Sequence, residues 1–316
     1  MAERGPRYGR PVPREEPGEG PGLPRPAVIL VGTPIGNLGD LSPRAVEALA
    51  AADVIAAEDT RRTRPLLTAA GIPSGGRLVS FHGPNEVELA ARLVERIVER
   101  RERLVCVTDA GMPGISDPGE RLVVAALAAG VPVEVVPGPS AALAALVVSG
   151  LPTGRFVFEG FLPRKGRQRA ARLAVLRAED RTVVLFEAPH RLEATLVDLA
   201  SALGPDRPVA VAREITKKFE TVWRGTLGQA ATGDGEAEEE RASRPQARGE
   251  QVIVIGPAPP VLTEEPSDDA VEEALRAQLA GGASTRDAAA AVATVLGIGR
   301  KRAYALATSL RRPARP

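Results

Sequence analysis

Between Ala27 and Gly150 the chain alternates short apolar runs with amphipathic stretches, and this alternation constrains the fold more than any other feature of the sequence. Helical periodicity separates the apolar runs, and many of their residues are β-branched. Strands that alternate with helices predict a mostly parallel sheet covered on both faces, which is an α/β fold. The predicted strands are 27–31, 53–58, 77–81, 103–108 and 131–136, and the predicted helices are 42–52, 63–72, 86–101 and 118–130.

A second group of apolar runs follows a break at Gly150–Gly154. Helical patterns separate only the first three of these runs, so we expect a second sheet of mixed direction. A loop over 229–249 is rich in Gly, Ala, Glu and Arg, has no periodicity and is expected to be exposed and mobile. The predicted strands of this second domain are 155–161, 182–188, 208–214, 219–225 and 250–256.

The sequence thus predicts several parts. Residues 1–26 are rich in Pro, Gly, Arg and Glu and lack the apolar core of a signal peptide, so they are expected to form a disordered tail. Two α/β domains, N-terminal 27–150 and C-terminal 151–256, are followed by a linker at 257–266. Residues 267–312 contain three helical segments, with a capping box at Ser284. This helical appendage is either a helix-turn-helix or a small docking bundle.

Charge and cysteine content restrict the function classes. The net charge of +1 over 316 residues excludes a globally basic nucleic-acid coat but allows a local basic patch. Cys106 is the one cysteine, so the chain has no disulfide framework, which fits the cytoplasm. The uncharged run Val135–Gly154 contains three prolines that divide it into a loop and a helix of about ten residues. We therefore expect a buried core helix there, and not a membrane span.

Three loops rich in Gly and Pro, 31–42, 107–119 and 135–142, follow predicted parallel strands. Ligands of open α/β sheets bind at the carboxyl ends of the strands. The glycine spacing matches neither the dinucleotide fingerprint nor the P-loop. Proline lacks an N–H donor, so these loops offer carbonyl oxygens, and the second loop adds the carboxylates of Asp109 and Asp117. Such a site suits a positively charged ligand, and S-adenosylmethionine, with its sulfonium and ammonium groups, fits.

Eight blocks between about Val28 and Gly256 resemble the tetrapyrrole-methylase superfamily and, within it, the ribosomal RNA small subunit methyltransferase I family. A single block would be weak evidence, but eight in the same order are specific. The blocks are GTPIGNLGDLSPRA, AEDTRRTRPLL, SFHGPNE, DAGMPGISDPG, PGPSA, FEGFLPRKG, FEAPHRL and AREITKKFETVWRG.

The resemblance implies a two-domain class III methyltransferase fold with S-adenosylmethionine in the cleft between the domains. The implied activity is 2′-O-ribose methylation of a decoding-centre cytidine in 16S rRNA, within the small ribosomal subunit, by a cytoplasmic homodimer without a metal ion. The cofactor positions that the resemblance carries over are Pro34, Asp109, Gly111, Ile115, Ser116, Asp117, Ser140 and Ala141, and, more loosely, Phe186 and Ala212.

Basic residues and rare residue types suggest where RNA and the reacting hydroxyl lie. The segment 155–191 is basic, which is typical of a surface that follows phosphates. Three of the four lysines and both histidines fall inside the matched blocks. The predicted RNA contacts are Arg61, Arg62, Arg164, Lys165, Arg167, Arg169, Arg191 and Arg213. The candidates for the general base or for positioning are Glu58, Asp59, His82, Glu187 and Lys217, and the sequence does not choose among them.

Three alternative functions remain open at this point. The chain could be a sister enzyme that methylates a tetrapyrrole or a protein side chain, although the basic 155–191 segment argues against a small polyanionic ring. It could be a ribosome-assembly factor that binds RNA without catalysis, although the intact Asp109/Asp117 loop argues against that. A DNA-binding regulator built on the terminal helices would leave the large α/β part unexplained.

Overall fold

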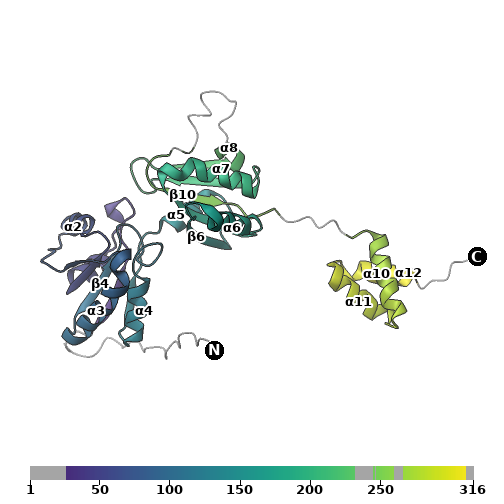
Figure 1. The fold of residues 1–316 in the computed structure, drawn as a ribbon, viewed down its shortest axis with the longest axis horizontal. Helices are drawn as coiled ribbons and strands as arrows, with labels where there is room; N and C mark the ends of the chain where they lie inside the picture. The colour runs from purple at the N-terminus through teal and green to yellow at the C-terminus, as the bar shows by residue number, and fades with distance from the viewer. Residues whose placement is uncertain (1–25, 232–244, 246, 260–265, 311–316) are drawn as a thin grey trace, which may run out of the picture. The chain divides into compact units, whose positions relative to one another are not determined.

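The structure is a computed structural model that describes residues 26–231, 245, 247–259 and 266–310 (Figure 1). The chain divides into two compact units, 1–258 and 259–316. The first unit contains both α/β sheets, and the second contains the terminal helices. Most of the expected tail, of the 229–249 loop and of the 257–266 linker lies outside the described residues.

The first sheet is entirely parallel, with the strand order β3-β2-β4-β1-β5. Parallel pairing requires crossover connections, and α1 to α4 supply them. This arrangement confirms the parallel sheet that the sequence predicts. The strands are β1 (Ala27–Val31), β2 (Val54–Ala57), β3 (Leu78–Ser80), β4 (Arg103–Val107) and β5 (Val133–Val136), and the helices are α1 (Pro43–Ala50), α2 (Thr60–Ala69), α3 (Glu86–Arg100) and α4 (Glu120–Ala128).

Successive side chains of each strand enter separate cores on the two faces of this sheet. Ile29 of β1 packs with Leu49 of α1 on one face, whereas Cys106 of β4 packs with Ile97 of α3 on the other. Cys106 is fully buried, and burial raises the pKa of its thiol to about 12, so it is an inert core residue as expected. Ser42 caps α1 by accepting a hydrogen bond from the Ala45 N–H.

The second sheet is mixed, as predicted, with the order β6-β7-β10-β8-β9. Only β6 and β7 pair in parallel, and the other neighbours are antiparallel. One detail differs from expectation: a short helix, α8 (Leu227–Ala231), follows β9 and packs Leu227 into the core of this domain. The strands are β6 (Phe156–Phe161), β7 (Thr182–Glu187), β8 (Pro208–Arg213), β9 (Thr221–Thr226) and β10 (Gln251–Ile255), and the other helices are α6 (Gly166–Arg177) and α7 (Leu192–Leu203).

Helix α5 (Ala141–Ser149) connects the two sheets and corrects one prediction. The expected buried core helix is buried on one side only, where Ala145 and Leu146 pack against the second sheet. Its other side leaves Leu143 51% and Val147 73% exposed. A helix that is apolar on all sides is usually buried on all sides. The expectation fails for α5 because only the second sheet covers it.

The second unit is a three-helix bundle formed by α10 (Asp268–Ala280), α11 (Thr285–Leu296) and α12 (Arg300–Leu310). Alanine and small aliphatic residues, such as Val271, Val292 and Ala303, form its own core. Ser284 accepts a hydrogen bond from the Asp287 N–H, which is the helix start that the sequence predicts. Among the described residues, no helix is long and apolar enough to cross a membrane.

Candidate active site

The three Gly/Pro loops meet at the carboxyl edge of the first sheet because two glycine positions let their backbones touch. Thr33 and Gly111 form an isolated antiparallel bridge, with N···O distances of 2.9 and 3.1 Å. A Cβ atom added to Gly32 would lie 2.6 Å from the Cα of Gly138 in the third loop. Any side chain at either glycine would force the first and third loops apart. The loops therefore form one rigid platform.

Carboxylates and backbone amides interlock where β2 and β4 end. The Asp109 N–H donates to Glu58 Oε2 (3.1 Å), and the Asp59 N–H donates to Asp109 Oδ1 (3.2 Å). Arg62 Nε lies 3.4 Å from Asp109 Oδ2. This network fixes the Asp109 side chain at the edge of the sheet.

Burial and mutual repulsion give these carboxylates unusual acidity. Burial raises the pKa of both Glu58 and Asp109. Burial, and then repulsion from Glu58, Asp109 and Glu250, raises the pKa of Asp117 to about 7. By contrast, hydrogen bonds from Arg61 lower the pKa of Asp59 to about 2. Glu58, Asp109 and Asp117 therefore hold their protons more tightly than ordinary carboxyl groups do.

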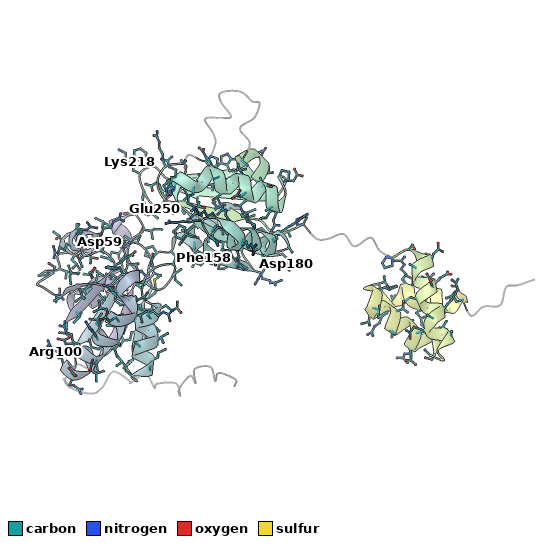
Figure 2. The ribbon with its side chains drawn as sticks, in the orientation of Figure 1. Asp59, Arg100, Phe158, Asp180, Lys218 and Glu250 are labelled. Atoms are coloured by element: carbon teal, nitrogen blue, oxygen red, sulfur yellow. The ribbon has the colours of Figure 1, made fainter. Side chains whose placement is uncertain are left out.

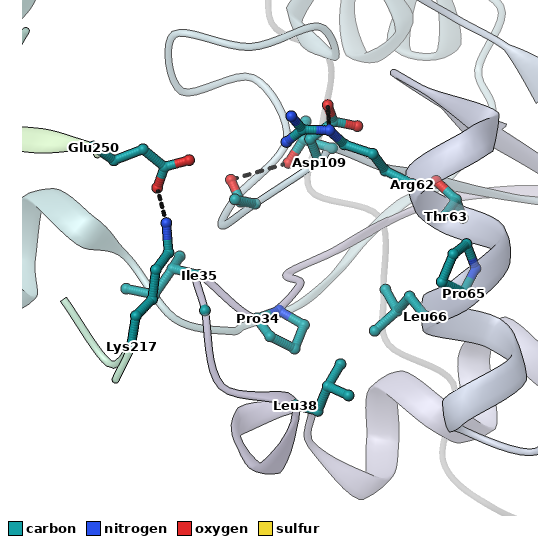
Figure 3. A pocket seen from close by; sticks show the side chains of 13 residues that line it. Pro34, Ile35, Leu38, Arg62, Thr63, Pro65, Leu66, Asp109, Lys217 and Glu250 are labelled. Carbon is teal, nitrogen blue, oxygen red and sulfur yellow. Dashed lines mark hydrogen bonds and ion pairs between the residues drawn. The ribbon is translucent and has the colours of Figure 1, made fainter. Parts of the chain in front are cut away.

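A cavity of about 290 Å³ opens beside Asp109 (Figure 3). Arg62 and Asp109 lie at its rim opposite Lys217 and Glu250, and most of the other lining side chains are apolar. It is built from both sheets of the first unit, since Lys217 and Glu250 flank strands of the second sheet. Its lining residues are Pro34, Ile35, Gly36, Leu38, Arg62, Thr63, Pro65, Leu66, Thr108, Asp109, Ala110, Lys217 and Glu250.

Lys217 reaches this cavity across the backbone of the first loop. Its aliphatic chain packs on Gly36, where an added Cβ would lie 2.3 Å from the Lys217 Cγ. Its Nζ contacts Glu214 at 3.1 Å and Glu250 at 2.9 Å. Burial opposes the charge of Lys217, but the two carboxylates outweigh it and raise the pKa of the ammonium. Lys217 is therefore a cation near neutral pH, which argues against a role as general base.

A second cavity of about 510 Å³ lies over the third loop and the start of α5. Ile35 lines both cavities. The Thr216 hydroxyl is buried and has no hydrogen-bond partner among the described residues, and the backbone of Thr216 has the strained φ of 68°. The other lining residues are Asp40, Pro137, Gly138, Pro139, Ser140 and Ala144.

The expected cofactor positions surround this platform. Pro34 and Asp109 line the first cavity, and Ser140, the N-cap of α5, lines the second. Ser116 has φ 64°, and its hydroxyl lies close to Gly160 of β6, because a Cβ added to Gly160 would come within 3.1 Å of it. Gly111 bridges to Thr33, and Ile115 is half exposed.

Three further expected cofactor positions belong to the apolar cluster between α5 and the second sheet, namely Ala141, Phe186 and Ala212. The ring of Phe186 packs edge-to-face against Phe158, with 5.0 Å between the centroids, and against Phe161. Ala212 is buried. An adenine ring would find apolar surface here.

The structure separates the five candidate bases. Glu58 and Asp59 lie in the carboxylate network, and Lys217 lines the cavity. Glu187 is 3% exposed, lines neither cavity and accepts hydrogen bonds from Thr195 Oγ1 (2.5 Å) and the Ala188 N–H while pairing with Arg191, so its carboxylate is engaged within the second domain. His82 precedes the short helix at 83–85 and does not line either cavity.

The predicted RNA contacts divide into exposed residues and residues that bond within the protein. Arg164, Lys165 and Arg167 are exposed before and at the start of α6. The prediction for Arg169 is wrong: it is 8% exposed, and its guanidinium bonds Asp198, Thr195 and the Pro163 carbonyl. Helical periodicity explains the error, since Arg169 lies on the inner face of a helix whose sequence is basic all round. Of the others, Arg61 pairs with Asp59, Arg191 bonds the Leu162 carbonyl, and Arg213 bonds the Arg248 carbonyl.

Several residues of the site carried no sequence signal. Glu250 stands alone before a β-strand, and its pairing with Lys217 arises from the antiparallel neighbours β8 and β10. Leu38, Pro65 and Leu66 read as ordinary loop and helix residues. Thr216 lies inside a matched block, but only the structure reveals its buried hydroxyl.

Comparison with known proteins identifies the family. Residues 27–231 match the family model of the tetrapyrrole (corrin/porphyrin) methylases. A ribosomal RNA small subunit methyltransferase I of Synechocystis sp. is 43% identical over 283 residues, which cover 90% of this chain and 98% of that protein. The chain belongs to this methyltransferase family. Its counterpart in Xylella fastidiosa is 51% identical over 226 residues, covering 72% of this chain and 80% of the relative.

A solved structure supports the fold. A conserved hypothetical protein from Aeropyrum pernix K1 superposes with a TM-score of 0.54 at 21% identity, covering 74% of this chain and 85% of that chain. The family resemblance predicted from the eight blocks is therefore confirmed, as are the methyltransferase activity and S-adenosylmethionine as the methyl donor.

The residues present fit that donor. Asp117 has no cation paired with it among the described residues, and three neighbouring carboxylates repel it. A ligand with sulfonium and ammonium charges would relieve this repulsion. The rigid loops and the apolar surface around Phe186 supply walls for its uncharged part.

Proposed function

We propose that this chain methylates the ribose 2′-oxygen of a decoding-centre cytidine in 16S rRNA, acting on the small ribosomal subunit in the cytoplasm. The names of the relatives support the rRNA substrate. The observation that carries the proposal is a cavity with a carboxylate network on one rim, a lysine on the other and apolar side chains between them. Such a cavity suits a nucleotide, because the apolar wall accepts the base and sugar and Lys217 and Arg62 attract the phosphate.

When bound, S-adenosylmethionine supplies the electrophilic methyl group. The protein must hold the 2′-oxygen in line with it, exclude water and remove a proton. Asp109 and Asp117 are proposed to hold the positive end of the donor. Lys217, fixed by Glu214 and Glu250, is proposed to hold an RNA phosphate at the opposite rim.

Glu58 is proposed as the proton acceptor. An effective base at neutral pH is ionised and yet has a pKa near the working pH. Glu58 lies in the carboxylate network at the end of β2, and burial raises its pKa, so its carboxylate is a stronger base than that of Asp59, whose pKa hydrogen bonds from Arg61 lower to about 2. We expect Glu58→Gln to lower the rate of methyl transfer about 100-fold or more, while S-adenosylmethionine affinity changes little. Asp59→Asn serves as the control, and an equal loss in both variants would remove Glu58 from this role.

The exposed basic residues before and at the start of α6 are proposed to follow the RNA backbone. The triple variant Arg164→Glu, Lys165→Glu and Arg167→Glu should weaken rRNA binding and reduce the slope of log affinity against log salt by roughly 0.7 to 0.9 per lost contact. Cofactor affinity should stay unchanged. An unaltered slope would show that these side chains are only solvated.

A homodimer is proposed from the apolar surface beside α5. Strand β5 is an edge strand of the first sheet, and Val135 is 52% exposed on it. Leu143, Val147 and Val148 of α5 are exposed as well. Edge strands and apolar patches are usually covered, and a second copy of the chain would cover both. Light scattering should report a dimer for the wild type and a monomer for Val147→Glu, and a wild-type monomer would refute the proposal.

The test of the activity itself is a 2′-deoxy substitution at the target cytidine. It removes the nucleophile and leaves the phosphates and base edges in place. Methyl transfer should vanish, while RNA affinity falls by about one hydrogen bond, roughly 0.5 to 1.5 kcal/mol. Continued methylation of the deoxy substrate at that nucleotide would place the acceptor on the base. Transfer to a tetrapyrrole and not to rRNA would overturn the substrate class.

A further inference from the structure

Phe219 occupies an unusual position at the apex of a tight turn. The Glu220 N–H donates to the Lys217 carbonyl at 3.2 Å, so Lys218 and Phe219 are the two central residues of that turn. Gly, Asn, Asp and Pro normally fill such positions because they suit the backbone there. Phe219 is 64% exposed, more than any other aromatic side chain of the described residues. An apolar ring in this place contributes nothing to the core of the protein.

The turn is held rigidly. Glu214 and Thr216 adopt the left-handed φ values of 52° and 68°, which cost free energy and persist only where the surroundings enforce them. The Thr216 N–H donates to Glu220 Oε2 at 2.6 Å, and the Lys217 N–H donates to the Glu214 carbonyl at 2.9 Å. The Lys217 ammonium anchors the base of the turn to Glu214 and Glu250. The backbone that carries the ring is therefore held in place.

That place adjoins the proposed nucleotide cavity. Lys217, which begins the turn, lines the cavity, and Phe219 is two residues further on. In Figure 2, Lys218 and Glu250 lie on the side of the second domain where Asp59 is labelled. The Lys218 Nζ lies 5.7 Å from the centroid of the Phe219 ring, so a cation and an aromatic surface are presented together. Unpaired RNA is bound by this combination, because bases stack on aromatic rings and phosphates attract lysine.

We propose that Phe219 is a stacking platform for an unpaired base of the RNA that flanks the methylated nucleotide, and that Lys218 contacts the adjoining phosphate. This proposal rests on the rRNA substrate proposed above. A rigid platform avoids the entropy loss of ordering a flexible loop on binding, which explains why strained backbone is kept here. The platform would select substrates with an unpaired base next to the target.

The test compares five variants in binding and methylation of the small-subunit RNA, in whichever form the wild type methylates. Phe219→Ala should weaken binding about 5- to 150-fold, as loss of a stacking ring does, with the salt slope unchanged. Phe219→Trp should keep wild-type affinity, whereas Phe219→Leu should behave like Phe219→Ala. Lys218→Gln should instead reduce the salt slope by roughly 0.7. Phe156→Ala, at a partly exposed ring at the start of β6, is the matched control and should bind like the wild type.

A fluorescent base analogue, 2-aminopurine, placed singly at unpaired positions flanking the target then identifies the base. Its emission should be quenched by the wild type at one position, and Phe219→Ala should relieve that quenching. Unchanged affinity of Phe219→Ala, in an enzyme whose wild type binds and methylates the RNA, overturns this proposal and leaves the function standing. Full affinity of Phe219→Leu would mean that an apolar contact without stacking is sufficient and would overturn it as well. Failure of the wild type to methylate any form of the RNA refutes the proposed function instead.

Discussion

Asp117→Asn should stabilise the ligand-free protein in a pH-dependent way. The carboxyl of Asp117 has a pKa of about 7, against 3.8 for an ordinary aspartate, because of burial and of repulsion from Glu58, Asp109 and Glu250. Between these two values the folded protein binds a proton that the unfolded chain has released. Stability therefore falls as the pH rises from about 4 to about 7, and the full penalty is present above pH 7.

The size of the effect follows from the shift. About three pKa units at 1.36 kcal/mol each give roughly 4 kcal/mol as an upper bound, and partial exposure of Asp117 to solvent reduces this to about 1–2 kcal/mol. Below about pH 4 the wild type is protonated in both the folded and the unfolded state and should match Asp117→Asn, whereas at pH 5 the unfolded chain is already ionised and part of the penalty is present. At pH 8 the wild type should be less stable than Asp117→Asn by about 1–2 kcal/mol.

Urea unfolding followed by circular dichroism at pH 5, 6, 7 and 8 measures the difference, with the exposed Asp206→Asn as control. Taking the difference in unfolding free energy between the wild type and each variant cancels the pH dependence of all other titrating groups. Saturating S-adenosylmethionine should reverse the order at pH 8, because its positive charge interacts favourably only with ionised Asp117. A wild-type-to-Asp117→Asn difference that is the same at every pH would refute the assignment of Asp117 as a strained, uncompensated carboxylate.

Three further changes probe other parts of the protein. Gly36→Ala should displace Lys217 and lower the rate of methyl transfer at least tenfold with the fold intact, because a Cβ there would lie 2.3 Å from the Lys217 Cγ. Gly154→Ala is the control, since an added Cβ at Gly154 meets no atom within 4 Å. Equal rates in the two variants would contradict the argument. Gly32→Ala should abolish S-adenosylmethionine binding in calorimetry by separating the first and third loops, and normal affinity would show that the loops adjust. Arg207→Met should destabilise the protein by about 3 kcal/mol in urea unfolding, since its buried guanidinium donates to the carbonyls of Arg177, Glu179 and Gly256 and the substitution removes all three hydrogen bonds.

Much of this architecture was predictable because it rests on local patterns. The parallel sheet follows from strands that alternate with helices, and the start of α1 follows from Ser42 and Pro43. The position of the site followed from loops at the carboxyl ends of parallel strands. Local patterns also caused the errors. A basic helix does not reveal which arginine faces inward, so Arg169 was misplaced, and an apolar helix does not reveal that only one side is covered, as in α5.

The unpredictable part of the site depends on contacts between segments far apart in the sequence. Glu250 meets Lys217 only because β10 lies antiparallel beside β8, and no spacing in the sequence encodes that pairing.

This pairing has a specific consequence for function. Glu250 both holds the Lys217 ammonium and raises the pKa of Asp117, so a single carboxylate couples the proposed phosphate contact to the proposed cofactor contact. An RNA phosphate that competes with Glu250 for Lys217 would leave the Glu250 charge less compensated, and its repulsion of Asp117 would then favour a bound cation more strongly. RNA and S-adenosylmethionine should therefore bind with positive cooperativity, and Glu250→Gln should remove this cooperativity. Titration calorimetry with each ligand, in the absence and in the presence of the other, measures the effect.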